Sequence, residues 1–363
     1  MSNSQIIFID ENIPLIAQAL SPCGDIVTFS GRELKREDLI EGGATALIVR
    51  STTPVGPVLL DGTGVRFVGS ATSGIDHIDK EYLNSRGIAF ADAPGSNANS
   101  VAEYMVYGIL KWALPEHGSP EGKTLGVIGF GNIGTIISQY GHKMGMRVLV
   151  NDPPLLDSGF NFPDFVEYSE IGDIFPRADV VTNHVPKYIF GKYKTIGLIG
   201  RREIESMREG SLLMHASRGG VVDESPLLEA LSENRISALI DVWANEPVIN
   251  KSLAKMALQI SPHVGGYSRD GKLRGTRRMA DAFARFSGLS PDYSELDAEL
   301  GEYRPATSDM FAKYDYLLKR IDESRDFTGD HRRLWESLTL DYKARAAAFD
   351  QLRKNYPVRR ETL

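Results

Sequence analysis

A glycine pattern near the middle of the chain most constrains how it can fold. Residues 129–134, GFGNIG, fit G-x-G-x-x-G and stand between the apolar run TLGVIGF and the helical pattern IGTIISQYGHKM. The three glycines allow a tight turn, close approach of the backbone to a pyrophosphate, and packing of the helix on the strand. Free N–H groups at the start of the helix would bind the phosphates. We therefore predict a dinucleotide-binding unit whose cofactor-binding residues are Gly129, Gly131, Asn132, Ile133 and Gly134.

An acidic residue at the end of the next apolar run indicates which dinucleotide binds. Asp152 closes the run RVLVND, and no arginine stands at that strand end. A carboxylate there would accept hydrogen bonds from both adenosine ribose hydroxyls and would repel a 2′-phosphate. We therefore predict NAD rather than NADP as the cofactor, with Asp152 binding it. The alternative is a structural turn followed by a solvated aspartate.

Apolar runs alternate with helical or polar stretches through most of the chain, in two series. The first contains QIIFID, DIVTFS, TALIVRS, VRFVGSA and GIAFADA, and the second contains TLGVIGF, RVLVND, DVVTNHV, SLLMHAS, ISALIDVW and LQISPH. Strands that alternate with helices indicate parallel sheets with crossover connections. We predict an α/β fold, with a doubly wound parallel sheet in a Rossmann NAD-binding domain over residues 99–269. A discontinuous substrate domain is expected over residues 1–98 and 270–288.

Residues 289–363 are predicted to form a C-terminal helical or α+β dimerisation domain. A polar stretch, LSPDYSELDAELGEYRPATSD, comes first, and two helices are expected after it. In the last helix an apolar seam with 3–4 spacing runs from Trp335 to Tyr356. Arg359 and Arg360 follow that helix, and they predict either a solvated face or a contact with a phosphate.

Three polar residues stand just after strand-like runs of the second series. Arg218 follows SLLMHAS, Glu246 follows ISALIDVW and His263 follows LQISP. Ligands of open parallel sheets lie beyond the carboxyl ends of the strands, so we expect these three side chains to converge. A histidine can take the proton of an alcohol, a carboxylate can orient the imidazole, and an arginine can bind a substrate carboxylate. Each residue alone could be an ordinary loop residue, but together they predict the catalytic site of a dehydrogenase.

The composition argues against several other classes of protein. A net charge of −7 disfavours nucleic-acid binding. The single cysteine, Cys23, excludes a disulfide within the chain and a multi-cysteine metal site. The histidines show no metal-ligand spacing, so no catalytic metal is expected. Because no targeting segment or membrane span is recognisable, we expect a cytoplasmic protein without membrane or nucleic-acid partners.

Several segments resemble a known family. ASRGGVVDE, DVWANEP and SPHVGGY resemble the active-site blocks of the D-isomer-specific 2-hydroxyacid dehydrogenases, and FDQLRKNYPVRR and GKYKTIGLI resemble one branch of that family. The resemblance runs from residue 8 to residue 360. It implies a flavodoxin-like substrate domain, a homodimer and a small phosphorylated 2-hydroxy acid as substrate. The implied reaction is the NAD-dependent oxidation of 4-phospho-D-erythronate to 3-hydroxy-2-oxo-4-phosphooxybutanoate, in vitamin B6 biosynthesis.

The resemblance also implies roles for individual residues. Arg218 would bind the substrate carboxylate or carbonyl, Glu246 would pair with His263, and His263 would transfer the proton. The family usually has a threonine where Val185 stands in the segment HVP, which predicts the loss of one side-chain hydrogen bond to the cofactor. The implied cofactor contacts are Asp152, Val185, Ala216, Ser217, Arg218, Asp241 and Gly266, and the implied substrate contacts are Ser51, Thr72 and Tyr267.

Two other functions stay open, and one further substrate contact is expected. The chain could be another 2-hydroxyacid dehydrogenase, such as one that acts on 3-phosphoglycerate. It could also be an NAD-sensing, corepressor-like binding protein, because such proteins retain a similar Arg-Glu-His set. A phosphorylated substrate needs cationic or N–H donors, and Arg50, at a strand end beside Ser51, is the first candidate. The alternative is that Arg50 is an ordinary strand-end charge.

Overall fold

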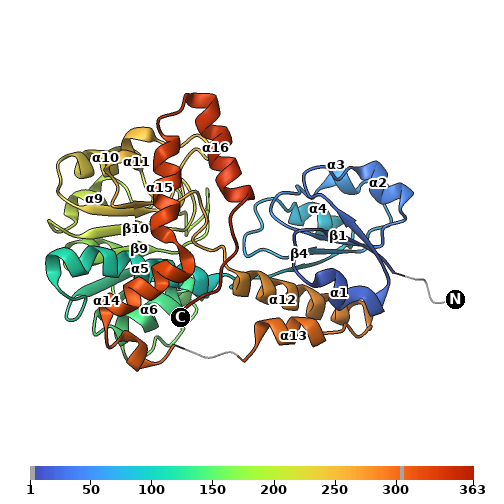
Figure 1. Cartoon of the computed structure of the whole chain (residues 1–363), viewed down its shortest axis with the longest axis horizontal. Coiled ribbons are helices and arrows are strands. Elements are labelled where there is room, and N and C mark those ends of the chain that lie inside the picture. Colours follow the sequence, from blue (N-terminus) through green and yellow to red (C-terminus); the bar gives the residue numbers. More distant parts are fainter. Residues whose placement is uncertain (1–4, 303–305) are drawn as a thin grey trace. The chain divides into compact units, whose positions relative to one another are not determined.

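The computed structural model describes residues 5–302 and 306–363 and divides the chain into two compact units. The first unit comprises Met1–Asn97 and Ser268–Arg304, and the second comprises Ala98–Tyr267 and Pro305–Leu363. Each unit consists of a parallel β-sheet with helices packed on it (Figure 1). The predicted α/β fold class is therefore confirmed.

The sheet of the first unit has five parallel strands in the order β2-β1-β3-β4-β5. In its register Ile7 of β1 pairs with Ala46 of β3. This is the flavodoxin-like order, and the direction of the strand order reverses between β1 and β3. The strands are β1 (Ile6–Asp10), β2 (Asp25–Phe29), β3 (Ala46–Val49), β4 (Phe67–Ser70) and β5 (Ala89–Asp92).

The first unit has an apolar core on each face of its sheet. Ile7 and Ile9 of β1 pack in one apolar cluster with helices α1 and α12, whereas Phe8 packs in another with α2, α3 and α4. Successive side chains of a strand point to opposite faces, so an unbroken apolar run needs helices on both. The helices are α1 (Ile16–Leu20), η1 (Ser21–Cys23), α2 (Arg36–Glu41), α3 (Pro57–Leu60), α4 (Lys80–Ser85), α12 (Arg269–Ser287) and α13 (Ser294–Leu300).

The sheet of the second unit has seven parallel strands in the order β12-β11-β10-β9-β6-β7-β8. This is the Rossmann order with one added strand, and its direction reverses between β6 and β9. Strand β8 was not predicted, because three residues with Glu167 at their centre form no apolar run. The strands are β6 (Thr124–Ile128), β7 (Arg147–Asn151), β8 (Val166–Tyr168), β9 (Val180–Asn183), β10 (Leu212–His215), β11 (Ser237–Ile240) and β12 (Gln259–Ile260).

The second sheet is also covered on both faces. Leu125 and Val127 of β6 pack with α5, α6 and α14, whereas Ile128 packs in the cluster that contains α8, α9, α10 and α11. The helices are α5 (Ala98–His117), α6 (Asn132–Lys143), α7 (Pro153–Asp157), α8 (Ile171–Arg177), α9 (Arg201–Ser206), α10 (Glu224–Ser232), α11 (Lys251–Met256), η2 (Ser308–Phe311), α14 (Tyr314–Arg325), α15 (Phe327–Ser337) and α16 (Tyr342–Lys354).

The prediction for the C-terminal helices was wrong in two respects. Helix α13 forms inside the polar stretch, and three α-helices, not the two expected, follow it within the described part of the second unit. The apolar seam does not lie on one helix, because α15 ends at Ser337 and α16 begins at Tyr342 (Figure 1). The carboxylate of Asp341 accepts the N–H of Ala344 (2.9 Å) and so caps α16. A capping aspartate favours a new helix start, whatever the spacing of the apolar residues around it. The dimerisation role of residues 289–363 stays a prediction.

The described residues, 5–302 and 306–363, contain no helix that is long and apolar enough to cross a membrane. Within the same residues there is no group of three or more histidine, cysteine or acidic side chains that could hold a metal ion.

Candidate active site

The glycine turn between β6 and α6 has the shape that a dinucleotide needs. Gly129 follows β6 with a φ of 92°, a conformation that favours glycine. A Cβ on Gly134 would lie 1.9 Å from the carbonyl oxygen of Gly129, so only glycine allows α6 to pack this closely on the turn. Gly131 caps α6, and no atom lies within 4 Å of the place where its Cβ would be. The N–H groups at the start of α6 are therefore open to a phosphate.

Asp152 lies at the end of β7 and is connected to the glycine turn. Its Oδ2 accepts the N–H of Phe130 (2.7 Å), and its Oδ1 accepts the N–H of Leu155 (3.1 Å) as the cap of α7. These two bonds fix the carboxylate beside the turn and use two of its four lone-pair positions. Acceptor capacity therefore remains for the two hydroxyls of a ribose, and the residues at β6 and β7 fit NAD.

The segment after β9 lies against the same turn. The Cγ1 atom of Val185 is 3.0 Å from the position that a Cβ on Gly129 would take. Val185 therefore packs on the turn with an apolar side chain, which has no hydroxyl to donate to a cofactor. Its neighbour His184 bonds Thr182 (Nε2 to Oγ1, 2.9 Å), and burial together with the charge of His215 lowers the pKa of His184 to about 3.

Polar contacts connect the carboxyl ends of β9 and β10. Asn183 Oδ1 accepts the hydroxyl of Ser217 and lies 3.2 Å from His215 Nδ1, while Asn183 Nδ2 donates to the carbonyl of Met214 (3.1 Å). Ala216 and Ser217 are buried in this network, and Arg218 follows them with its side chain half-buried. The Nη1 atom of Arg218 donates to the carbonyl of Ser217 (2.9 Å). Arg218, which we predicted to be catalytic, thus lies at the carboxyl end of the sheet. It follows β10, the strand that pairs with β11.

The structure brings Glu246 and His263 into direct contact. His263 Nδ1 lies 2.9 Å from Glu246 Oε2 and 3.1 Å from Glu246 Oε1, and Oε1 also accepts the N–H of Trp243 (3.0 Å). Burial would raise the pKa of Glu246, but the hydrogen bond and charge of His263, the Trp243 N–H and the charge of Arg353 outweigh it and lower that pKa. His263 has a φ of 59°, in the left-handed region that is strained for a side-chain-bearing residue and is found at functional sites. Glu246 is therefore an ionised carboxylate held against one ring nitrogen of His263.

Asp241 holds the loop that carries His263. Its Oδ1 accepts the hydroxyl of Ser261 (2.7 Å) and the N–H groups of Val264 (2.8 Å) and Gly265 (3.1 Å). A Cβ on Gly265 would lie 2.7 Å from Tyr104, so the loop packs closely on α5. Two further residues predicted as contacts lie in this loop, Gly266 and Tyr267. We predicted Asp241 only as a cofactor contact. Its hydrogen bonds show that it also fixes the conformation of this loop.

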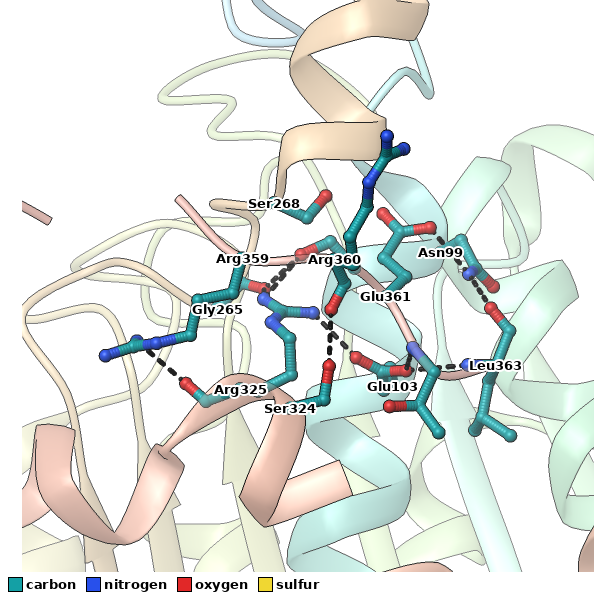
Figure 2. Close-up of polar contacts among 12 residues, drawn as sticks. Asn99, Glu103, Gly265, Ser268, Ser324, Arg325, Arg359, Arg360, Glu361 and Leu363 are labelled. Atoms are coloured by element: carbon teal, nitrogen blue, oxygen red, sulfur yellow. Dashed lines mark hydrogen bonds and ion pairs between the residues drawn. The ribbon is translucent and has the colours of Figure 1, made fainter. Parts of the chain in front are cut away.

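Sequence reasoning missed the C-terminal residues that hold this loop. Arg325, at the end of α14, is fully buried, and its Nη2 donates to the carbonyls of Tyr267 (3.0 Å) and Gly265 (3.4 Å) and to Ser100 (2.9 Å). Its Nη1 bonds Glu103 of α5 (2.7 Å), as Figure 2 shows. No local pattern distinguishes Arg325 from the many exposed arginines of the chain, so this role required the structure.

Glu103 also holds the last described residues. Its Oε2 accepts the N–H groups of Thr362 (2.5 Å) and Leu363 (2.7 Å), and Asn99 Nδ2 donates to the carbonyl of Leu363 (2.5 Å) (Figure 2). One fully buried carboxylate thus joins α5, α14 and the segment after α16. A second C-terminal cation, Arg353 of α16, lies near the candidate site. Its Nη1 atom is 3.8 Å from Oε2 of Glu246.

The guanidinium of Arg359, one of two residues considered for a phosphate, is engaged within the chain. Its Nη1 donates to the carbonyl of Arg325 (2.9 Å), and its Nη2 donates to Asp326 (3.1 Å). These bonds place Arg359 in the structural network of α14 and α15 and leave it poorly suited to a substrate phosphate.

The predicted substrate contacts Arg50, Ser51 and Thr72 lie in the first unit. Arg50 and Ser51 directly follow β3, and Thr72 follows β4, where its hydroxyl donates to the carbonyl of Gly74 (3.1 Å) and lies 3.0 Å from that of Ser70. Tyr267, the remaining predicted substrate contact, ends the continuous part of the second unit. All four stand beyond the carboxyl ends of parallel strands, where ligands of such sheets bind.

Comparison with known proteins identifies a family. Residues 103–265 match the model of the D-isomer specific 2-hydroxyacid dehydrogenase, NAD binding domain. The chain is 37% identical to the erythronate-4-phosphate dehydrogenase of Salinibacter ruber over 99% of this chain and 93% of that protein, and 39% identical to that of Azotobacter vinelandii over 98% and 92%. A solved D-lactate dehydrogenase from Aquifex aeolicus, complexed with NAD and lactic acid, covers 82% of this chain and 100% of its own, with a TM-score of 0.64 and 22% identity. The last likeness concerns the fold alone.

The relatives are matched over nearly their whole length and well above 30% identity, and they share one description. Together with the glycine turn, the Glu246–His263 pair and the two parallel sheets, this establishes that the chain belongs to the erythronate-4-phosphate dehydrogenases, a branch of the D-isomer specific 2-hydroxyacid dehydrogenase family.

Proposed function

We propose that Arg218, Glu246 and His263 carry out the reaction of this family, the NAD-dependent oxidation of 4-phospho-D-erythronate to 3-hydroxy-2-oxo-4-phosphooxybutanoate in vitamin B6 biosynthesis. The observation that carries this assignment is the contact of His263 Nδ1 with both carboxylate oxygens of Glu246. Nε2 of His263 makes no hydrogen bond within the described chain, so it is the nitrogen that can meet a substrate. An imidazole held through Nδ1 is a suitable base for an alcohol proton.

The reaction removes a hydride from the carbinol carbon and a proton from its hydroxyl group. His263 takes the hydroxyl proton at Nε2, and the ionised Glu246 stabilises the imidazolium that forms. The bound NAD would supply the acceptor for the hydride from the same carbon. Arg218 binds the substrate carboxylate through parallel hydrogen bonds and so orients that carbon.

The glycine turn and Asp152 hold the cofactor in this proposal. The start of α6 binds the pyrophosphate, and the Asp152 carboxylate accepts the ribose hydroxyls. The segment at Val185, the end of β10 at Ala216 to Arg218, and the loop with Asp241 and Gly266 line the rest of the cofactor site. Ser51, Thr72 and Tyr267 contact the substrate.

Replacing Asp152 by serine is expected to raise the KM for NAD about 10- to 100-fold, because charge-assisted bonds to the ribose are lost. Serine keeps the capability to cap α7, so kcat should change little. Discrimination against NADP should also weaken, since the repelling carboxylate is gone. Steady-state kinetics with both cofactors measure these changes. The matched control is Asp157→Ser, an aspartate of α7 that pairs with Lys192 on the surface and should leave both constants unchanged. An unchanged KM for NAD would contradict the role of Asp152.

The activity itself is tested with the purified protein, NAD and 4-phospho-D-erythronate, by following the formation of NADH. Turnover of 4-phospho-D-erythronate is the expected result. Turnover of 3-phosphoglycerate alone would instead support another 2-hydroxyacid dehydrogenase. Binding of NAD without turnover of either acid would support a cofactor-sensing protein.

We also propose a cytoplasmic homodimer formed through the C-terminal helices. Aromatic and apolar side chains are exposed at α15 and α16 and between them: Trp335 (39%), Leu340 (42%) and Tyr342 (62%). Exposed apolar groups gathered at neighbouring elements are typical of interfaces. Light scattering is expected to give twice the chain mass of 40.0 kDa, and Trp335→Glu combined with Tyr342→Glu is expected to give the monomer. A wild-type monomer at micromolar concentration would rule the dimer out.

A further inference from the structure

A cation from the C-terminal part of the second unit lies beside the Glu246–His263 pair. Arg353 stands in the last turn of α16, and its Nη1 atom is 3.8 Å from Oε2 of Glu246. Among residues 5–302 and 306–363 no other carboxylate pairs with Arg353, and its Nε is buried without a hydrogen-bond partner. The proposed function gives this arginine no task.

The packing of α16 holds Arg353 in this position. Phe349, four residues earlier on the helix, is fully buried in an apolar core cluster of the second unit. Residues four apart lie on one face of a helix, so the burial of Phe349 turns Arg353 toward the interior. Just beyond the helix, the hydroxyl of Tyr356 donates to Asp330 (2.8 Å), and its ring packs edge-on against Tyr267 with the centroids 5.7 Å apart. The end of α16 is therefore anchored on both sides of Arg353.

The carboxylate of Glu246 lies between His263 and Arg353. Its Oε1 accepts the N–H of Trp243 (3.0 Å), and both of its oxygens lie within 3.1 Å of Nδ1 of His263. Arg353 approaches from the side of Oε2, the oxygen that has no backbone donor among the described residues. One negative charge thus faces the imidazole and a permanent positive charge together.

This arrangement affects how readily the pair takes up a proton. A general base must be unprotonated before it can accept a proton, and a carboxylate in contact with an imidazole raises the proton affinity of the imidazole. Groups in such close contact titrate as one system, so a nearby cation lowers the proton affinity of the whole pair. Burial raises the pKa of Glu246, and the charge of Arg353 is among the effects that outweigh it.

We propose that Arg353 is a positioning residue for the proton transfer. Acting through Glu246, it lowers the pH at which the Glu246–His263 pair takes up a proton, and so keeps His263 ready to accept the hydroxyl proton of the substrate at Nε2. The inference rests on the proposed function, which assigns the proton transfer to His263. It gives α16 a part in catalysis in addition to its place in the fold.

Other titratable groups surround the pair. They stand at the end of β10 (His215, Arg218), directly after β11 (Asp241), on α10 (Glu224) and on α15 (Asp330, Arg333). Burial lowers the pKa of His215 to about 3, so this histidine stays neutral in the range tested below. Burial raises the pKa of Glu224. All these groups are the same in every variant, so a difference between variants reports the residue that was replaced.

The test replaces Arg353 by methionine and follows kcat/KM for 4-phospho-D-erythronate from about pH 5 to about pH 9. The acid limb of the profile is expected to move to higher pH by about 0.5 to 1 unit, because a cation beside the pair is lost. At pH values above that limb, kcat should stay within about threefold of the wild-type value, since His263 and Glu246 are both present. Arg353→Gln, which is neutral but polar, should move the limb in the same way.

Two variants separate the charge of Arg353 from its packing. Lys354→Met removes a positive charge from the exposed neighbour in the same turn of α16, and it should leave the limb in place. Arg353→Lys keeps a charge, so it should bring the limb at least halfway back to the wild-type position. A shift that Arg353→Lys does not reverse, or an equal shift in Lys354→Met, would overturn the inference. So would a limb in Arg353→Met within about 0.2 pH unit of the wild type.

Failure of the inference can be separated from failure of the proposed function. If wild type turns over 4-phospho-D-erythronate and the limb is the same in Arg353→Met, the function stands and the role of Arg353 is refuted. If wild type does not turn over this substrate, the function fails, and NMR of the histidine rings decides the role of Arg353 without catalysis. The signal of His263 is identified by its absence in His263→Ala. Its titration midpoint should be higher in Arg353→Met than in wild type and Lys354→Met, and equal midpoints in all three proteins would refute the inference.

Discussion

Replacing His263 by alanine is expected to lower kcat with 4-phospho-D-erythronate by about 10²- to 10⁴-fold, the usual contribution of a general base. Nε2 of His263 makes no hydrogen bond within the described chain, while Nδ1 is held by Glu246 at 2.9 Å. The glycine turn and Asp152 bind NAD in the proposed site and are untouched, so the dissociation constant of NAD should stay within about threefold. Stopped-flow formation of NADH and a fluorescence titration with the cofactor measure the two quantities.

Two variants control this experiment. His142→Ala removes an exposed histidine of α6 that stacks on Phe165, and it should leave kcat unchanged. Glu246→Gln keeps an acceptor for the Trp243 N–H but loses the charge that stabilises the imidazolium, so a smaller fall of about 10- to 100-fold is expected. Turnover by His263→Ala at close to the wild-type rate would mean that another group takes the proton.

Replacing Arg325 by methionine is expected to lower the free energy of unfolding by about 3–5 kcal/mol, because it leaves the buried Glu103 without its cation. Both side chains of this pair are inaccessible to solvent, with Nη1 of Arg325 2.7 Å from Oε1 of Glu103. Burial raises the pKa of Glu103 against the opposing effects of Arg325 and of the Leu363 and Thr362 N–H groups, so loss of Arg325 would raise it further. Urea denaturation of the wild type and the variant measures the difference.

The double variant Glu103→Gln with Arg325→Met tests the cause of that loss. Removing both charges abolishes the uncompensated carboxylate, so the double variant should be more stable than Arg325→Met alone. Arg201→Met is the exposed counterpart: it breaks an ion pair with Glu229 (2.6 Å) on the surface, and its stability should be hard to distinguish from that of the wild type. A double variant as unstable as the single one would show that lost packing, rather than an unpaired charge, is responsible.

Arg325 also connects the fold to the candidate site. It holds the carbonyls of Gly265 and Tyr267, next to His263, and these contacts cross from α14 to the loop after β12. Variants at Arg325 that remain folded should therefore lose kcat in addition to stability. Such a residue cannot be recognised from its neighbours in sequence, because its partners lie about 60 and more than 200 positions away.

Much of the second unit could be predicted because its signals are local. The glycine turn, the apolar runs and the acid at the end of β7 each occupy a few consecutive residues, and the reversed strand order follows from crossover rules once the strands are known. Strand β8 was missed because Glu167 breaks its apolar character. The split of the last helix was missed because the apolar 3–4 spacing, broken once by Arg345, continues on both sides of the Asp341 cap. In both places one residue outweighed the periodic pattern around it.

The candidate site, too, could be predicted only where its signals are local in the sequence. The sequence places Arg218, Glu246 and His263 after strands, and the parallel sheet then requires that they share one edge. It does not reveal that Asp241 holds the His263 loop through three hydrogen bonds, nor that Arg353 lies 3.8 Å from Glu246. Those contacts depend on loop conformations and on helices far along the chain.

The sequence by itself thus determined the two parallel α/β sheets, the dinucleotide turn and the branch of the dehydrogenase family, since each depends on short patterns or on whole-chain similarity. Only the tertiary structure decided that Glu103 and Arg325 are buried together, and that α14, α15 and α16 belong to the second unit. Whether a charged side chain is exposed, paired or buried depends on what packs around it. The residues that pack around such a side chain come from segments distant in sequence, so no local pattern reveals its burial or its partner.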